Sequence, residues 1–547
     1  MSTLERRKMG LGALAVALTI IGCGDDDSGT ADTGVDATID AARDSRADAQ
    51  SDAGLDQATD SLPVDDAALD MADAGDPTGI FAGLEPTVVA SLSAEGEPVA
   101  PSRPWSLSGN GQYLFFDTVG ALDDSDDNDT ADVYVYDRLS ESVTLLSRTR
   151  SGGAAGGFQP ESTPDGRMVF FASSSAEILA EGEDTNGETD SFVLDRDADE
   201  DGVFDEFEEA GSTTYTRLSL STAGDEGNGS SENALPSSNG RFAVFLSRAT
   251  NFVAGATEAV FRVYLRDRDV DGNGIYDEPG GVRTLLVARM MDGSPTPTAN
   301  RLAIGSTVVS DDGRYVAFVA DDGIVAGDDN EMRDLFVYDR DTDEDGVFDE
   351  DGLTNTIRMS VADDGSQAMG PGNHVSQFTM SRDGRFLFFG TAAPNLDASD
   401  SGDVEDLFIH DRDADEDGVF DEPGAIETRI LVRGPEGELL DGYAGDPVVS
   451  DDLRFVAFES QATNFEAVDN GVFDVFVLDR DPTGSGTLDT APEVVQVSLA
   501  PDGSSLTGFS ANPLISANGV VVAFETGAPE FQATDARQCV WTRNPAR

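Results

Sequence analysis

Short runs of alternating apolar and polar residues recur from residue 85 to the end of the chain. The commonest run follows a turn and ends in aromatic or small apolar residues. Its seven copies are SGNGQYLFF from Ser108, TPDGRMVFF from Thr163, SSNGRFAVF from Ser237, SDDGRYVAF from Ser310, SRDGRFLFF from Ser381, SDDLRFVAF from Ser450 and SANGVVVAF from Ser516. Alternation with a period of two is typical of a β-strand, so each copy predicts a tight turn followed by a strand.

Three further segments accompany each of these runs. In the fourth copy they include a strand over residues 334–338 and another over residues 356–361, and a more polar segment precedes each turn, as at residues 445–450 and 511–516. Four short antiparallel strands in each of seven repeats predict an all-β fold, a seven-bladed β-propeller over residues 85–547. The polar segment is expected to be innermost, beside the central channel.

The two ends of the repeat region complement each other. A copy of the outer-strand phrase, TVVASLSAEG, begins at Thr87, before the first full repeat, whereas the last repeat stops after residues 539–543. We therefore expect the N-terminal strand to pair into the last blade and close the ring. Trp105 and Trp541 would then lie in neighbouring blades, where both are expected to pack.

The alternation of DGR-aromatic strands with DVFVYDR-like strands resembles the TolB-type and WD-like propeller repeats of exported bacterial proteins. The resemblance covers the chain from residue 85 to its end and implies the fold. It does not imply one activity, because such repeats occur in binding proteins, translocation accessories and noncatalytic domains of peptidases.

The N-terminal region predicts export and a lipid anchor. Residues 1–22 have a basic start followed by an apolar stretch over residues 9–21, which is too short to span a bilayer and is typical of a signal peptide. The sequence Ile20-Ile21-Gly22-Cys23 resembles the lipobox of bacterial lipoproteins, which implies a lipid on Cys23. An ordinary signal peptide with an incidental cysteine is the alternative.

Residues 23–84 are predicted to be the lipidated cysteine and a disordered tether rich in Asp and Ala. Acids recur at every fourth position from Asp32 to Asp60, and on a helix this spacing would place like charges on one face. The whole chain carries 106 acidic and 34 basic residues, a formal charge of −72. This charge argues against nucleic acid or an anionic membrane surface as a partner. Lys8 is the only lysine, so lysine-based Schiff-base and phosphate-loop chemistry is excluded from the mature chain.

Four acidic insertions follow the DVFVYDR-like strands: DRDADEDGVFDE from Asp195, DRDVDGNGIYDE from Asp267, DRDTDEDGVFDE from Asp339 and DRDADEDGVFDE from Asp411. Alternating oxygen ligands followed by a Gly suit a hard cation such as Ca²⁺. The pattern resembles the first nine positions of an EF-hand loop and the calcium loops of thrombospondin type 3 repeats. The candidate ligands are Asp197, Asp199, Asp201, Val203, Asp205 and Glu208; Asp269, Asp271, Asn273, Ile275 and Asp277; Asp341, Asp343, Asp345, Val347 and Asp349; and Asp413, Asp415, Asp417, Val419 and Asp421.

These loops depart from the EF-hand at position 12, where only the first copy has an acid, Glu208. Glu206, Glu278, Glu350 or Glu422, or water, could complete the ligand shell in its place. The alternative is a set of solvated Asp-Gly turns that bind nothing. A second group of acidic loops, such as DDSDDNDTAD from Asp123 and DASDSGDVED from Asp397, is expected on the opposite face. For these loops, metal binding and hydrogen-bonded turns are left equally open.

Evidence for catalysis in the sequence is weak. The chain has no Gly-x-Ser-x-Gly motif and only two histidines: His410 is expected to be packed in a strand and His374 to lie at the channel rim. We interpret the chain as an exported, lipid-anchored, monomeric propeller that binds Ca²⁺ and a protein or glycan ligand at the bacterial envelope. The alternative is a hydrolase or lyase acting on polysaccharide or peptide at the channel. Inner-segment residues converging on a pocket would favour the enzyme, and a channel lined by small and apolar groups would favour the binding module.

Overall fold

The computed structural model describes residues 87–90, 102–290, 293–295, 307–321, 323–330, 332–370, 374–375, 377–400, 404–465, 471–500, 504–531 and 538–543. The predicted signal peptide, Cys23 and the tether lie outside these residues. Within the described residues, no helix is both long enough and apolar enough to cross a membrane.

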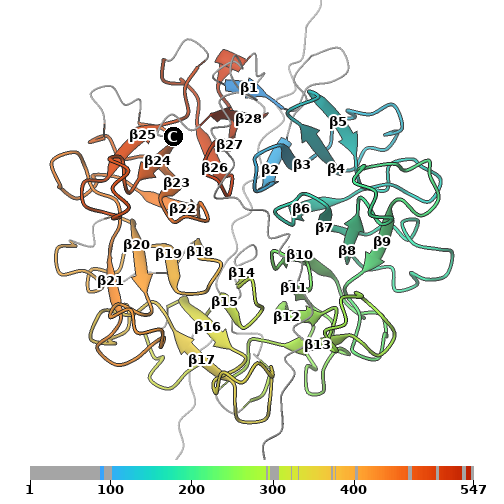
Figure 1. Ribbon diagram of the computed structural model, residues 1–547, viewed down its shortest axis with the longest axis horizontal. Helices are drawn as coiled ribbons and strands as arrows, with labels where there is room; N and C mark the ends of the chain where they lie inside the picture. The colour runs from blue at the N-terminus through green and yellow to red at the C-terminus, as the bar shows by residue number, and fades with distance from the viewer. Residues whose placement is uncertain are drawn as a thin grey trace, which may run out of the picture. The chain divides into compact units, whose positions relative to one another are not determined.

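The strands form seven antiparallel sheets of four strands each, arranged around a central axis (Figure 1). We call each sheet a blade and number the blades by their innermost strands. These are β2 (Ser102–Leu107), β6 (Phe158–Ser162), β10 (Ser231–Pro236), β14 (Thr307–Val309), β18 (Phe378–Met380), β22 (Ala444–Val449) and β26 (Ser510–Ile515). The all-β propeller fold is thus confirmed, with the polar segments nearest the axis.

Two further strands follow in each blade. The second strands are β3 (Tyr113–Thr118), β7 (Met168–Ser173), β11 (Phe242–Ser247), β15 (Tyr315–Ala320), β19 (Phe386–Thr391), β23 (Phe455–Ser460) and β27 (Val521–Thr526). The third strands are β4 (Asp132–Asp137), β8 (Asp190–Asp195), β12 (Arg262–Asp267), β16 (Asp334–Asp339), β20 (Asp406–Asp411), β24 (Asp474–Asp479) and β28 (Gln538–Arg543). Many of these strands are buried along their whole length, because both faces of a blade pack against neighbouring blades.

The outermost strands of blades 1 to 6 are β5 (Ser142–Leu145), β9 (Thr214–Arg217), β13 (Arg283–Leu286), β17 (Asn355–Arg358), β21 (Glu427–Ile430) and β25 (Glu493–Gln496). A short 3₁₀ helix, η2 (Pro529–Phe531), follows β27. In blade 7 the outermost strand is β1 (Thr87–Val89), which pairs with β28 so that Thr87 faces Thr542 and Val89 faces Val540. This pairing confirms the predicted closure of the ring by the N-terminal strand.

Apolar clusters join each blade to the next. Leu114 and Phe116 of blade 1 pack in one cluster with Val521 and Ala523 of blade 7. Trp105 in β2 and Trp541 in β28 therefore lie in neighbouring blades, as predicted, although the side chain of Trp541 is outside the described part of the structure.

The turn glycine between the first and second strands serves both the turn and the blade interface. Gly384 has φ +79°, and a Cβ added to it would lie 2.5 Å from Cδ2 of Tyr315 in the preceding blade. At Gly166, with φ +75°, the added atom would lie 2.8 Å from Cδ2 of Tyr113. Glycine is required here both for the left-handed backbone and for the close approach of an aromatic ring.

Candidate functional site

Three of the four predicted calcium loops bring three carboxylates together. The acids at loop positions 1, 3 and 5 each offer an oxygen within 4.8 Å of the other two, and the first acid is buried whereas the others are exposed. The three groups are Asp197, Asp199 and Asp201 in blade 2; Asp341, Asp343 and Asp345 in blade 4; and Asp413, Asp415 and Asp417 in blade 5. In blade 3, position 5 is Asn273, whose Nδ2 donates to Oδ2 of Asp271 at 3.1 Å.

Backbone N–H groups hold the shape of these loops. In blade 2, Asp197 accepts from the N–H of Asp201 at 3.0 Å and from the N–H of Gly202 at 3.1 Å. Gly202 has φ +88°, which allows the chain to turn back over the first carboxylate. Because the backbone supplies these donors, the loop can form before any ion arrives.

Blade 6 contains a natural comparison, DPTGSG from Asp481, with hydroxyl side chains at positions 3 and 5. Asp481 accepts from the N–H of Ser485 at 2.8 Å and from the N–H of Gly486 at 2.7 Å, which is the pattern seen in blade 2. These backbone donors help to lower the pKa of Asp481 to about 2. Acids at positions 3 and 5 are therefore not needed for the shape of the loop.

The acidic loops carry an electrostatic cost that the blade 6 loop avoids. In blade 4, desolvation and then repulsion from Asp345 raise the pKa of Asp343. In blade 2, desolvation and repulsion from Glu209 and from the Asp201 and Asp199 carboxylates raise the pKa of Glu206. Oε2 of Glu206 is buried and accepts no hydrogen bond, whereas Glu208 is exposed. Glu206 is thus the better-placed acid of the two to complete a ligand shell.

The carboxylates at position 9 have a different partner. Asp205 binds Arg196 through both oxygens, with Nε–Oδ1 of 2.8 Å and Nη2–Oδ2 of 2.5 Å. The same pairing joins Asp349 to Arg340 and Asp421 to Arg412. In blade 3, Arg268 contacts Asp277 through Oδ2 alone, and the buried Oδ1 accepts no hydrogen bond. A guanidinium that binds both oxygens satisfies the carboxylate, so we leave Asp205, Asp349 and Asp421 out of the ligand set proposed below.

These arginines also fix the blade interface. Arg340 is 1% exposed, donates from Nη1 to the carbonyl oxygen of Gly313 at 2.6 Å, and lies over the rings of Phe348 and Phe242. Phe242 belongs to the preceding blade, whereas Phe348 is at position 8 of the acidic loop. The loop therefore ties two blades together through its apolar and acidic residues, whether or not it binds a cation.

The loops on the opposite face are held by hydrogen bonds in several blades. Asp132, the first residue of β4, accepts from Oγ of Ser147 at 2.7 Å, from the N–H of Gly156 at 2.8 Å and from Nδ2 of Asn128 at 2.9 Å. This arrangement favours the hydrogen-bonded-turn interpretation for blade 1.

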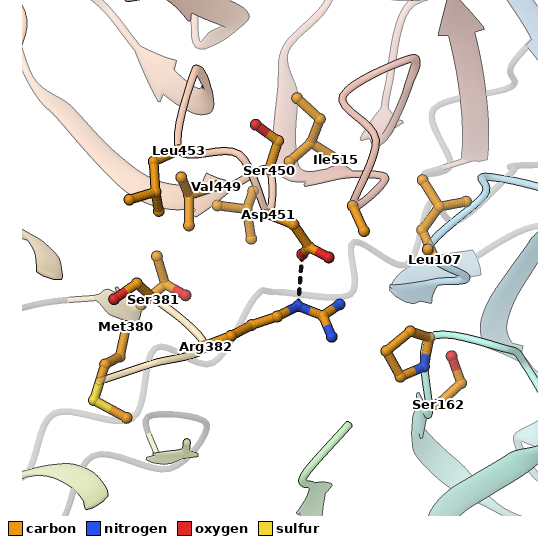
Figure 2. Close-up of a pocket in the computed structure, with 15 residues that line it drawn as sticks. Leu107, Ser162, Met380, Ser381, Arg382, Val449, Ser450, Asp451, Leu453 and Ile515 are labelled. Atoms are coloured by element: carbon orange, nitrogen blue, oxygen red, sulfur yellow. Dashed lines mark hydrogen bonds and ion pairs between the residues drawn. The ribbon is translucent and has the colours of Figure 1, made fainter. Parts of the chain in front are cut away.

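At one end of the inner strands lies a cavity of about 210 Å³ (Figure 2). Its lining includes Leu107, Met380 and Ile515. Arg382 reaches across it, donating from Nε to Oδ1 of Asp451 at 2.6 Å and from Nη1 to Oγ of Ser238 at 2.5 Å. Arg382 therefore links blade 5 to blades 6 and 3 across this opening.

Acidic side chains gather toward the other end of the inner strands, and sequence reasoning missed them. Three successive blades, 6, 7 and 1, have an acid at the next-to-last position of the second strand, whereas the other blades have Ala172, Leu246, Val319 and Gly390. The three acids are Glu459, Glu525 and Asp117. Aligning the second strands with one another would have revealed this pattern.

Inner-strand residues add to this group, which we call the channel acids: Asp117, Glu161, Asp446, Glu459 and Glu525. Burial raises the pKa of Glu161 to about 8 and that of Asp446 to about 6, in both cases against the attraction of Arg103. Burial and then repulsion from Asp446 raise the pKa of Glu459 to about 7. Glu161, Asp446 and Glu459 therefore exchange protons near neutral pH, because burial disfavours their charged forms.

Trp105 has a polar role beside these acids as well as packing. Its Nε1 donates to Oδ2 of Asp117 at 2.8 Å, and the guanidinium of Arg103 lies 4.1 Å from the centre of its ring. Arg103 in turn donates from Nη2 to Oδ1 of Asn512 in blade 7 at 3.1 Å. Packing was the predicted role of Trp105, and the structure adds contacts with an acidic side chain, Asp117, and a basic side chain, Arg103.

The two histidines lie in different surroundings. His410 is buried in β20, its Nδ1 shares a hydrogen bond with Oγ1 of Thr428 at 2.7 Å, and burial lowers its pKa to about 4. This is the packed strand residue that the sequence predicted. His374 is exposed and accepts from the N–H of Arg333 through Nδ1 at 2.9 Å.

Neither a protein-family model nor a curated protein sequence matches the chain. Similar solved structures include hydrazine synthase from Kuenenia stuttgartiensis, with 13% identity over 81% of this chain and 96% of that chain and a TM-score of 0.38. The β-propeller domain of the Trilobed protease from Pyrococcus furiosus has 8% identity over 82% and 97%, with a TM-score of 0.42. TolB from Acinetobacter baumannii has 10% identity over 80% and 81%, with a TM-score of 0.31. The similarity is one of fold, and no activity is transferred from it.

Proposed function

We propose that the chain is an exported binding or scaffold module whose acidic loops bind Ca²⁺ and thereby stiffen one face of the propeller. The observation that carries the proposal is the difference between the loops. At positions 1, 3 and 5, blade 6 reaches the loop shape with one carboxylate, whereas blades 2, 4 and 5 place three within 4.8 Å of one another. Carboxylates that the fold does not need, and that repel each other, suit a hard cation with oxygen ligands.

The proposed ligand set is smaller than the one that the sequence suggested. It comprises the carboxylates at positions 1, 3 and 5, the carbonyl oxygen at position 7, as at Val203, and water. In blade 2 it also includes Glu206, because its buried Oε2 accepts no hydrogen bond. The ion would offset the repulsion within each group.

Equilibrium dialysis against ⁴⁵Ca²⁺ tests this proposal. The protein is the chain without residues 1–22, carrying Cys23→Ser so that it remains unlipidated. We expect at least three ions per chain. The control replaces positions 3 and 5 of the blade 2, 4 and 5 loops with the Thr and Ser of blade 6, and it should bind three fewer ions. Equal binding by the two proteins would reject the proposal.

We also propose that a lipid on Cys23 holds the propeller at the bacterial envelope, with a protein or glycan as its ligand. The lipobox-like sequence supports this proposal. Metabolic labelling with a radioactive fatty acid should mark the natural chain and not a Cys23→Ala variant. Label on both chains, or on neither, would count against the anchor.

A specific observation favours hydrolysis at the channel as a second candidate function. A carboxyl that keeps its proton near neutral pH is suited to general acid catalysis, and Glu161 and Asp446 are acids of this kind. Glycan and peptide panels assayed with the natural chain and with Glu161→Gln test this candidate. An activity that the variant lacks, at an unchanged melting temperature, would favour the enzyme over the scaffold.

A further inference from the structure

A hydrogen bond between outer edges recurs at three of the five blade interfaces from blade 1 to blade 6. The second residue of the outermost strand donates its hydroxyl to a main-chain carbonyl oxygen of the preceding blade. The bonds join Tyr215 to Leu146 at 2.6 Å, Thr284 to Leu220 at 2.7 Å and Thr428 to Val361 at 2.6 Å. Each bond holds the rims of two blades together.

Among the described residues, the interface between blades 3 and 4 and the one between blades 5 and 6 lack this bond. In blade 4 the strand position is Thr356, which pairs with Tyr338, and in blade 6 it is Val494, which has no hydroxyl. Each of these two interfaces contains a large cavity, of about 710 Å³ and about 820 Å³ respectively. We call the larger one the 5/6 cavity.

The 5/6 cavity has a largely apolar wall and two arginines that already have partners. Nη2 of Arg429 lies 2.5 Å from Oδ2 of Asp489, and Nη2 of Arg433 lies 3.5 Å from Oδ2 of Asp397. Because each guanidinium is paired with a carboxylate, the cavity favours a neutral occupant over an anion. Its apolar lining residues include Leu431 of blade 5 and Phe465, Leu478 and Val494 of blade 6.

Blade 1 has an arginine at the same place, and the protein covers it with an aromatic ring of its own. Arg148 and Arg433 each lie six residues after the first residue of their outermost strand. Arg148 is held near Asp123, at 3.4 Å, much as Arg433 is held near its own aspartate. The guanidinium of Arg148 lies 4.6 Å from the centre of the Phe207 ring in blade 2. Within the described part of the chain, no ring lies over Arg433.

Phe207 belongs to a segment that blade 6 lacks. Asp205 and Asp489 hold the same loop position, since each binds the arginine nine residues before it. β9 begins nine residues after Asp205, whereas β25 begins four residues after Asp489. The longer segment of blade 2 carries Phe207 to the arginine of blade 1, and Tyr215 follows it with its hydroxyl bond. The blade 1 and 2 interface thus accepts a chain segment that presents aromatic side chains.

We propose that the 5/6 cavity binds an aromatic side chain, Tyr or Phe, presented by a segment of a protein partner, with its ring against Arg433. The face of an aromatic ring carries partial negative charge and complements a guanidinium, and its apolar body suits the apolar wall. The volume lies within the range of about 300–1,000 Å³ that is usual for ligand pockets, and it leaves room for residues beside the aromatic one. The inference rests on the binding role proposed above and narrows its ligand to protein.

Photocrosslinking of the unlipidated chain tests this proposal. The probe is acetyl-Gly-Bpa-Gly-amide, in which Bpa is 4-benzoylphenylalanine, and the crosslinked residues are identified by mass spectrometry. We expect crosslinks within residues 429–437 and 491–494, and we expect an excess of acetyl-Gly-Tyr-Gly-amide to suppress them. The corresponding leucine peptide should compete about fivefold less well, which corresponds to the ~1 kcal/mol of a cation–π contact.

Val494→Tyr fills the cavity with the residue that blade 2 has at this strand position, so it should abolish these crosslinks. Pro423→Phe is the matched control, because it places a ring two residues after the position 9 acid of blade 5, at the interface that Thr428 closes. It should leave the crosslinks unchanged. If Val494→Tyr does not fold, as judged by circular dichroism, Ala491→Phe decides, because it places a ring two residues after Asp489, as Phe207 is placed after Asp205.

The outcomes are distinct from those of the calcium proposal, because none of them depends on the number of ions bound. No crosslink to these residues in the parent, or an undiminished yield in the folded cavity-filling variant, would overturn the site. Equal competition by the leucine and tyrosine peptides would overturn the aromatic preference. The tyrosine peptide should also compete better than p-cresol, and equal competition would identify a free phenol, in place of a protein segment, as the ligand.

Discussion

Converting the acidic loops to the blade 6 pattern is the perturbation with the clearest expected result. The variant carries Thr at position 3 and Ser at position 5 of the blade 2, 4 and 5 loops, six substitutions in all. Blade 6 shows that a loop with these side chains keeps the hydrogen bonds from positions 5 and 6 to the first acid. The variant should therefore fold, and its melting temperature in chelator should be no lower than that of the parent.

The size of the calcium effect follows from linkage. At a free concentration ten times the dissociation constant, one site adds about 1.4 kcal/mol to the free energy of unfolding, so three sites add about 4 kcal/mol. An unfolding entropy of about 2.1 cal/mol/K per residue over roughly 460 residues is close to 1 kcal/mol/K. Calcium should thus raise the melting temperature of the parent by about 4 °C, and the variant should lose this response.

Differential scanning calorimetry of both proteins, in EDTA and in Ca²⁺, measures the effect. Mg²⁺ at the same ionic strength separates specific binding from screening of the large negative charge of the protein. The reasoning would be refuted if parent and variant gave equal shifts, or if the variant in EDTA melted several degrees below the parent. The second result would mean that the acids at positions 3 and 5 are needed for the loop shape itself.

Three further predictions follow from the contacts described above. Arg340→Ala should destabilise the propeller by about 3 kcal/mol in urea unfolding, because it leaves the buried Asp349 carboxylate with only the half-exposed Arg283 at 3.4 Å, and adding Asp349→Asn should recover part of the loss. Deleting residues 85–90 should lower the melting temperature and promote association through the exposed edge of β28, as measured by light scattering; a monomer with the parent melting temperature would show that ring closure is dispensable. Glu161 has a pKa raised to about 8 in the folded chain, so the folded state holds its proton more tightly than the unfolded state; its contribution to stability is complete below about pH 4 and is lost as the pH rises through 8. Glu161→Gln should flatten the fall in unfolding free energy between pH 5 and pH 8, and an unchanged slope would show that this carboxyl titrates normally.

The strands, their order and the closing strand could be predicted because seven copies of the same strand pattern support one another. Alternation with a period of two identifies each strand. The last repeat lacks an outer strand of its own, so the extra strand at residues 87–89 could be assigned to it. The role of Asp205 could not be predicted in this way. The spacing of the acids shows which oxygens could reach an ion. It does not show that the side chain of Arg196 binds both oxygens of Asp205.

The channel acids were hidden for a related reason. Glu459 and Glu525 each stand alone among apolar strand residues, and only the ring brings their blades together. Local pattern fixes strands well, but the partners of a buried charge come from elsewhere in the chain.

Anomalous diffraction from crystals grown in Ca²⁺ would test the central claim most directly, because it locates each ion. The account predicts anomalous peaks between the carboxylates of positions 1, 3 and 5 in blades 2, 4 and 5, and no peak in the blade 6 loop at Asp481. Crystals that diffract well from a calcium solution but show no peak at any of the three acidic loops would contradict it.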